Sequence, residues 1–338
     1  MTRPRLLCCV LTALGATLAH ADSYSVANTF HIGGDGKWDF PTVDSAAHRL
    51  YLSRGTHVMV VDTTSGKVID DIPETPGVHG IAIASDLGRG YISVGKSNQV
   101  KVFDLSTRQI VASIAVGVKP DAILYDEQTH QVFAFNGHSD NVSVIDGRTS
   151  AVIATVSLGG NPEFAQTDGN GTIFVNIESK SEVVALDARQ HKITARWALP
   201  GCEGPTGLAL DVAHHRSFSV CANAKMTILD TSTGKALATL PIGPRADAVV
   251  FDGDQQDAFS ANGDATLTVV HETDPTHFAV AQVVKTAPGA RTIALDSATH
   301  KMYLPTAAFG PANASKDEDD RILPGSFAVL VVDATRKE

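Results

Sequence analysis

The sequence has few cysteines and lacks the short motifs of several common chemistries. Only Cys202 and Cys221 lie beyond the N-terminal segment 1–21. No Cys-x-x-Cys pair occurs, which argues against a thioredoxin-like redox centre and against c-type haem attachment. Gly-x-Ser-x-Gly, His-x-His and His-Glu-x-x-His are also absent, and no glycine-rich phosphate loop follows a strand. The sequence therefore gives no support for familiar hydrolase, nucleotide or haem chemistry.

Long apolar runs are absent beyond the N-terminal segment. Nothing after Ala21 approaches the roughly 18 apolar residues of a membrane-spanning helix. The N-terminal segment carries Arg3 and Arg5, an apolar run that begins at Leu6, and small residues at Ala19 and Ala21 around a cleavage site. This is the pattern of a secretory signal peptide. We therefore expect a signal peptide at residues 1–21, one domain over residues 22–338, no membrane span and a periplasmic location.

Positive charge is also in deficit. The full chain has a formal net charge of −10 at pH 7, and loss of the N-terminal segment, with two arginines and no acid, takes it to −12. An acidic protein repels phosphate backbones, which argues against nucleic acid as a partner. We expect a monomer without a nucleic-acid partner.

What the sequence does have is one unit that returns seven times. Each copy is an apolar strand ending in an acid, a short polar turn and a second apolar strand. The acids recur at a nearly constant step, which lengthens only before the last copy: Asp62, Asp104, Asp146, Asp187, Asp230, Glu272 and Asp333. A period near 42 with several short strands per unit is the signature of a β-propeller. We predict an all-β, seven-bladed propeller with four-stranded antiparallel blades.

The two ends of the chain indicate how the ring closes. The last unit stops after Asp333, where its outer strand should begin, while Ser25–Ile32 reads as an outer strand with no blade before it. Pairing the two removes exposed strand edges, so we predict that the N-terminal strand completes the last blade. The longer last step reflects an insertion at residues 306–326 of blade 7, which we expect to fold over one mouth of the channel as a lid.

Repetition separates structural residues from candidate site residues. A residue that recurs in every blade is needed by the fold, whereas one that varies between blades is free to serve a site. The acids at the ends of the third strands recur, and we interpret them as caps of the following turns. Four histidines also recur, each four residues after an aspartate, and we interpret them as structural: His48, His130, His215 and His300.

The position at the start of each inner strand varies strongly from blade to blade. Alignment of the units on the aromatic residue of the second strand places one residue per blade at this position: Asp39, His79, Asp121, Glu163, Thr206, Asp247 and Arg291. Inner strands converge on the axis of a propeller, so we expect these side chains to ring one mouth of the channel. Like charges this close raise carboxylate pKa values unless a cation or Arg291 compensates.

Carboxylates together with one imidazole suit a divalent cation. We therefore predict a divalent metal ion held by His79, Asp121, Glu163 and Asp247. A small polar ligand would be held by the titratable ring residues, with Trp38 as a stacking wall: Asp39, His79, Asp121, Glu163, Asp247 and Arg291. Two residues before the ring position, Lys37, Lys119 and Arg245 form a basic outer collar.

The sequence is compatible with three functions. The first is a protein that binds a metal ion or a small polar ligand, and the second is a metal-dependent hydrolase or lyase that uses the same ring. The third is a protein-interaction scaffold that uses the rim and the insertion. The acids could also simply cap loops or bond neighbouring blades, so whether the protein is an enzyme stays undecided.

The two cysteines beyond the N-terminal segment both fall in blade 5. Cys202 lies just before the inner strand and Cys221 lies at the far end of the second strand, so the hairpin brings them to one face. An even pair is expected in an oxidising compartment. We predict a disulfide, with two buried free thiols as the alternative.

The chain resembles a known class of exported propellers. Its second strands, such as Tyr51-Leu-Ser-Arg54 and Phe133-Ala-Phe-Asn136, are degenerate forms of the YVTN repeat. Over nearly the whole mature length it is similar to the YncE-like family, most specifically at Gly36-Lys-Trp-Asp-Phe40, Gly77-Val-His-Gly80, Lys119-Pro-Asp-Ala122, Asn161-Pro-Glu-Phe164 and Gly289-Ala-Arg-Thr292. The resemblance implies a seven-bladed periplasmic propeller and little about chemistry.

Overall fold

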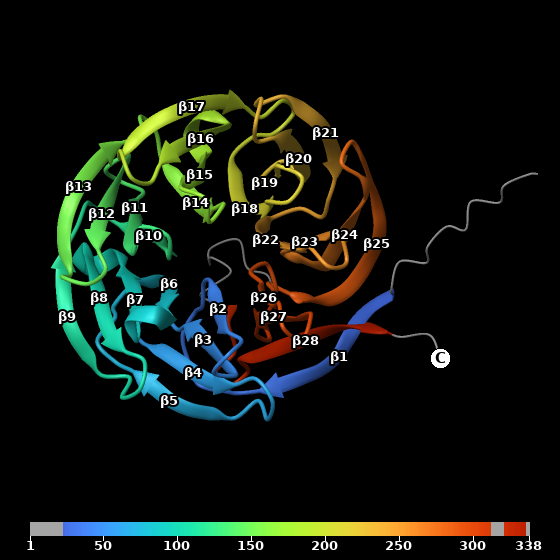
Figure 1. Ribbon diagram of the computed structural model, residues 1–338. Helices are drawn as coiled ribbons and strands as arrows, with labels where there is room; N and C mark the ends of the chain where they lie inside the picture. Colours follow the sequence, from blue (N-terminus) through green and yellow to red (C-terminus); the bar gives the residue numbers. More distant parts are fainter. Residues whose placement is uncertain (1–22, 312–320, 336–338) are drawn as a thin grey trace, which may run out of the picture.

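Seven four-stranded sheets are arranged as a ring around a central axis (Figure 1). The structure is a computed structural model and describes residues 23–311 and 321–335. Every strand pairs antiparallel with its neighbours in the sheet. This confirms the predicted all-β, seven-bladed propeller with four-stranded antiparallel blades.

The first four blades follow one another along the chain, each from the axis outward. Blade 1 holds β2 (Pro41–Asp44), β3 (Arg49–Ser53), β4 (Val58–Asp62) and β5 (Val68–Ile72), and blade 2 holds β6 (Val78–Ala84), β7 (Arg89–Val94), β8 (Gln99–Asp104) and β9 (Ile110–Ala115). Blade 3 holds β10 (Pro120–Asp126), β11 (Gln131–Asn136), β12 (Asn141–Asp146) and β13 (Ala151–Ser157), and blade 4 holds β14 (Pro162–Thr167), β15 (Thr172–Ile177), β16 (Glu182–Asp187) and β17 (Lys192–Ala198).

The last three blades complete the ring. Blade 5 holds β18 (Pro205–Asp211), β19 (Arg216–Cys221), β20 (Lys225–Asp230) and β21 (Ala236–Pro241), and blade 6 holds β22 (Ala246–Asp252), β23 (Asp257–Asn262), β24 (Asp264–Asp274) and β25 (His277–Pro288). Blade 7 holds β26 (Ala294–Asp296), β27 (Lys301–Thr306), β28 (Ala328–Thr335) and the N-terminal β1 (Ser23–His31). Three single-turn 3₁₀ helices lie between strands: η1 (Ser85–Leu87), η2 (Gly95–Ser97) and η3 (Glu178–Lys180).

The ring closes through its two ends, as predicted. The N-terminal β1 pairs antiparallel with β28 from Ser23 opposite Thr335 to His31 opposite Ala328. In Figure 1 the blue β1 and the red β28 lie side by side in the last blade. The pairing removes the free edge that an open ring would expose.

The hydrophobic cores lie between neighbouring blades, because each sheet buries both faces against its neighbours. One such core joins Phe133 and Val142 of blade 3 to Ala165 and Val175 of blade 4. Second and third strands are therefore almost wholly buried, whereas the outer strands alternate between more buried and exposed residues. This burial explains the near-continuous apolar runs in the middle strands of the repeat.

The acids at the ends of the third strands cap turns in the first five blades. In each, the backbone N–H three residues later donates to the carboxylate at 2.7–3.0 Å. Blade 6 departs from the predicted pattern: His271, not Glu272, pairs with the first residue of the second strand, which is the position of Asp230 in blade 5. The sequence interpretation of Glu272 as a turn cap was wrong, because the hairpin of blade 6 is longer and Asp274 caps its turn instead.

The recurrent histidines are turn residues. His48, His130, His215 and His300 all have positive φ between 53° and 59° in the turns that follow the inner strands. Two of them also bond the preceding blade, since His130 Nδ1 lies 2.8 Å from Asp86 and His300 Nδ1 lies 2.8 Å from Asp252. These histidines therefore have structural roles, in turns and in contacts between blades.

The predicted disulfide between Cys202 and Cys221 is confirmed. Its two Cα atoms lie 5.4 Å apart, and it ties the loop before β18 to the end of β19. The signal peptide predicted at residues 1–21 lies outside the described residues, and so do residues 312–320 of the insertion. None of the helices in the described ranges has the length and apolar character of a membrane span.

Candidate functional site

A local irregularity of the inner strands aims the variable residues toward the axis. In blades 2 to 6 the first residue of the inner strand pairs with the second strand, and the register then shifts by one extra residue. The bulge contains His79, Asp121, Glu163, Thr206 or Asp247, according to the blade. A bulge bends the strand and redirects a side chain out of the regular alternation.

Blades 1 and 7 present their residues from the loops before the inner strand. The backbone N–H of Asp39 donates to Ser53 Oγ at 2.9 Å, and its carbonyl accepts from Thr292 Oγ1 at 3.1 Å. Arg291 lies three residues before β26, and its carbonyl accepts the N–H of Ala248 from blade 6. These contacts fasten the two loops to neighbouring strands.

All seven variable residues line one axial cavity of about 410 Å³. Glu178, which follows β15, and Arg245, which precedes β22, also line it. A second cavity of about 520 Å³ adjoins it and shares three of the seven residues, Asp39, His79 and Arg291. We call the first the ring cavity and the second the collar cavity.

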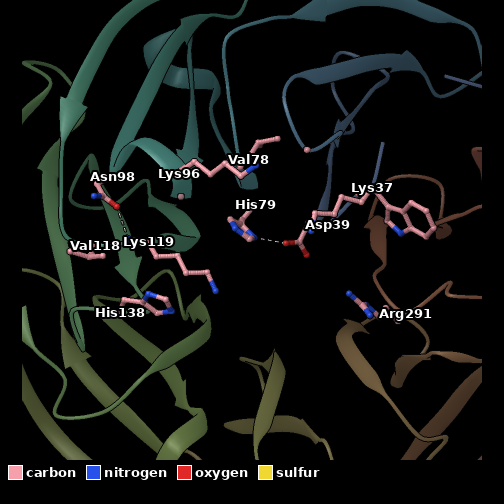
Figure 2. Close-up of a pocket in the computed structure, with 14 residues that line it drawn as sticks. Lys37, Asp39, Val78, His79, Lys96, Asn98, Val118, Lys119, His138 and Arg291 are labelled. Carbon is pink, nitrogen blue, oxygen red and sulfur yellow. Dashed lines mark hydrogen bonds and ion pairs between the residues drawn. The ribbon is translucent and has the colours of Figure 1, made fainter. Parts of the chain in front are cut away.

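The collar cavity has cationic walls. Figure 2 shows side chains of Lys37, Lys96 and Lys119 around the cavity, with His138 on one side and Arg291 on the other. The backbone N–H of Lys119 donates to Asn98 Oδ1 at 2.9 Å. This bond joins the two loops that carry Lys119 and Asn98. The predicted basic collar is therefore divided, because Arg245 lines the ring cavity whereas Lys37 and Lys119 line the collar cavity.

The tightest cluster joins three successive blades. His79 Nδ1 of blade 2 donates to Asp39 Oδ2 of blade 1 at 2.6 Å and lies 3.4 Å from Asp121 Oδ1 of blade 3 (Figure 2 for the first pair). Candidate ligand atoms of the three side chains all lie within 4.8 Å of one another. Each side chain is at most one-quarter exposed.

This cluster differs from the predicted metal-ligand set. His79 and Asp121 belong to it, Asp39 joins them, and Glu163 and Asp247 do not. Asp247 instead accepts from Arg291 Nε at 3.0 Å. The order of blades explains the difference, because His79 has blades 1 and 3 as neighbours, whereas Asp247 has Arg291 of blade 7 beside it.

Three carboxyl groups of the ring cavity, those of Asp121, Glu163 and Asp247, have raised pKa values. Burial and the neighbouring acids Asp121 and Asp247 raise the pKa of Glu163 to about 9. Burial raises the pKa of Asp121 to about 6 against the opposing charge of His79, and that of Asp247 to about 7 against the charge of Arg291. The ring cavity is thus a place where negative charge is poorly compensated.

The pKa of His79 is also raised, which favours the charged form of the imidazole. Burial alone would lower its pKa, but the hydrogen bond to Asp39 and the charge of Asp121 outweigh burial, and the pKa of His79 is raised. The imidazole therefore carries positive charge to a higher pH than a free histidine. It acts as a partial substitute for a cation between two carboxylates.

Trp38 lines the collar cavity and also contacts the described base of the insertion. Its ring centroid is 6.2 Å from that of Phe309, which lies within the insertion, and 5.6 Å from that of Phe327, which directly follows it. Phe309 in turn pairs with Ile322 in an isolated bridge. The described base of the insertion therefore stands against the cavity wall that Trp38 forms.

The sequence pattern did not identify several residues that line the two cavities. Lys96, Asn98, His138 and Glu178 follow the second strands of blades 2, 3 and 4. The loops between second and third strands leave the blade on the same face as the ring positions, which is the signal that could have found them. These loops vary between blades, as the ring positions do.

Known structures share the fold. No family model matches the sequence, and the search of curated proteins finds no match. Hydrazine synthase of Kuenenia stuttgartiensis has a chain that superposes with a TM-score of 0.70 at 15% identity, over 81% of this chain and 94% of that one. U3-55K gives 0.77 at 10% identity over 91% and 99%, and the RRP9 WD40 repeats give 0.78 at 9% over 93% and 99%. At such identities the likeness establishes the propeller fold alone.

Proposed function

We propose that this protein is an exported, periplasmic binding propeller of the YncE-like kind, and that it holds a divalent cation and a small polar ligand at the axis. The observation that carries the proposal is the convergence of Asp39, His79 and Asp121 from three successive blades, with candidate ligand atoms within 4.8 Å. Repetition strengthens it, because none of the three is required by the fold at that position.

The charges of the ring cavity favour a cation. Five carboxyl groups line it, against two guanidinium groups and one imidazole. A divalent ion would offset the repulsion that contributes to the raised pKa of Asp121. Carboxylate oxygens with one imidazole suit borderline ions such as Zn²⁺ and Mn²⁺, and open coordination positions would face the collar cavity.

The collar cavity supports the second half of the proposal. Its volume of about 520 Å³ is that of a small-molecule site, and its walls bring side chains of Lys37, Lys96 and Lys119 around the cluster. A ligand with a carboxylate or phosphate group would contact these lysines and the cation together. The indole of Trp38 completes one wall.

A cation titration of the metal-free protein tests the proposal. Calorimetry with Zn²⁺ and Mn²⁺ is expected to show binding at the axis that His79→Ala removes. His277→Ala is the matched control, because that imidazole lies 76% exposed on the outer hairpin of blade 6. Identical titrations for His79→Ala and wild type would refute a cation at this cluster.

Ligand recognition gives a second prediction. Lys119→Gln is expected to weaken binding of inorganic phosphate to the cation-loaded protein by about tenfold, the loss of one charge-assisted hydrogen bond. Lys101→Gln is the control, because Lys101 lies in β8 and lines neither cavity. Equal phosphate affinity for Lys119→Gln and wild type would contradict a role for the lysine wall.

A metal-dependent hydrolase or lyase is the second candidate. Glu163, with its pKa raised to about 9, stays protonated at neutral pH, as a general acid must. Turnover of phosphoesters or carboxylic esters that chelator and Glu163→Gln both abolish would favour this candidate. Cation binding without turnover on such substrates would favour the binding protein.

A further inference from the structure

A second cluster of unlike residues lies at the opposite ends of the inner strands, where blades 5 and 6 meet. It consists of Asp211 at the end of β18, His214 in the following turn and Glu272 in β24. β18 begins near the ring position Thr206 and reaches Asp211 about 17 Å further along, at the usual rise of a strand. The cluster is therefore separate from the axial site.

Comparison between blades singles out Glu272. Its backbone N–H donates to the carbonyl of the residue before the second strand, Gln256. The same bond identifies its equivalents in blades 1 to 5, which are small or apolar residues: Thr63, Leu105, Gly147, Ala188 and Thr231. Among these six described blades only blade 6 places an acid at this position.

The partner of Glu272 is singled out in the same way. His214 lies three residues after the last residue of its inner strand, and the residues at this position in the other blades are Ala47, Leu87, Thr129, Asn170, Gln255 and Thr299. The one histidine of this set thus faces the one acid of the other set. Neither residue is required by the propeller fold.

The geometry of the cluster is compact. His214 Nδ1 lies 2.6 Å from Asp211 Oδ2 and 3.5 Å from Glu272 Oε1, and ligand atoms of all three residues lie within 4.8 Å of one another. The side chains of Asp211 and Glu272 are 3% and 1% exposed, whereas that of His214 is 37% exposed. The two carboxylates are therefore buried, and only the imidazole of the cluster is in substantial contact with solvent.

Glu272 is incompletely satisfied. Both of its carboxylate oxygens are buried, and neither has a hydrogen-bond partner of ordinary geometry among the residues in the described ranges. Asp211, by contrast, accepts the backbone N–H groups of Ala213 and His214 through Oδ1. A buried carboxylate without such hydrogen bonds is rare in folded proteins and requires a compensating partner.

We propose that Asp211, His214 and Glu272 form a second divalent-cation site, which ties blade 5 to blade 6. Two carboxylates and one imidazole suit a borderline ion such as Zn²⁺ or Mn²⁺, and water completes the coordination on the exposed side of His214. The competing state is a protonated Glu272 without a cation, since burial and the charge of Asp211 raise the pKa of its carboxyl to about 7.

The repeat supplies conservative variants for the test. Glu272→Thr introduces the residue of blades 1 and 5, and His214→Thr introduces that of blades 3 and 7, so both fit the local backbone. Both are made in a His79→Ala background, which removes the axial site. Zn²⁺ is titrated into the metal-free proteins, and thermal unfolding by circular dichroism checks that each is folded.

The His79→Ala protein is expected to bind one equivalent of Zn²⁺ with a rise in its melting temperature. Glu272→Thr and His214→Thr in that background are each expected to lose this equivalent and the rise. Two outcomes would overturn the proposal: no Zn²⁺ binding by His79→Ala, or the same binding after Glu272→Thr. Because the axial site is absent from all these proteins, the result is independent of the function proposed for it.

Discussion

Glu163→Gln is expected to stabilise the metal-free protein at pH 9 by about 2 kcal/mol and to change its stability little at pH 4.5. The pKa of Glu163 rises from an ordinary 4.5 to about 9, chiefly through burial. Between these pH values the unfolded chain releases the proton of this carboxyl while the folded chain keeps it. The contribution of Glu163 to stability is therefore complete below pH 4.5 and is lost as pH rises toward 9.

The magnitude is smaller than the pKa difference alone implies. About 1.4 kcal/mol per pKa unit would give roughly 6 kcal/mol, but solvent in the ring cavity screens a side chain that is only partly buried. Glutamine keeps the shape of the side chain and removes its charge. The free energy of unfolding of the variant should therefore decline less with rising pH than that of wild type, because the contribution of the Glu163 carboxyl is absent.

Urea unfolding at pH 4.5, 7 and 9 with chelator measures the effect. Glu127→Gln is the control, because Glu127 is exposed in the turn after β10 and lies away from the ring cavity. We expect the free energy of unfolding of the control to change with pH as that of wild type does. A Glu163→Gln protein that declines with pH as steeply as wild type would show that this carboxyl is not held protonated.

Removal of the disulfide is the second large effect. The double variant Cys202→Ala, Cys221→Ala is expected to lose about 3 kcal/mol of unfolding free energy, because the bond closes a loop with a sequence separation of 19 residues. Both cysteines are buried, so their loss also removes apolar packing beside Leu208 and Leu229. Unfolding in urea with and without reductant, for wild type and variant, measures the difference.

The same variant also bears on the site. The disulfide ties down the loop that leads to Thr206, the ring residue of blade 5. Cation affinity at Asp39, His79 and Asp121 should nevertheless stay within about twofold, since these residues belong to blades 1 to 3 and distant sites act independently. A double variant as stable as wild type would contradict a structural role for the bond.

Much of the fold followed from the repeat. The period near 42 predicted the blade count, and the unpaired segments at the two ends predicted the closure, since pairing leaves no free edge. The position of each ring residue followed from alignment on the second-strand aromatics. The bulges that aim His79 and Asp121 had no sequence signal, because the extra residue is visible only in the strand pairing.

The grouping of the ring side chains could have been predicted more closely from the order of the blades. Ring order places Asp39 and Asp121 on either side of His79, and Arg291 beside Asp247, so adjacency alone favours the observed pairs. Nothing in the sequence indicated that Glu272 lies one residue beyond the position equivalent to that of Asp230, because its distance along the chain from Asp230 fits the repeat. Only the pairing of Asp257 with His271 reveals that Glu272 faces the blade boundary.

We propose a cation site at the axis, formed by unlike residues at equivalent positions of successive blades. Anomalous diffraction from crystals soaked in Zn²⁺ tests it most directly. A peak is expected between Asp39, His79 and Asp121, at about 2.0–2.2 Å from their ligand atoms. Crystals with no peak at the axis, and with His79 still hydrogen-bonded to Asp39, would contradict it.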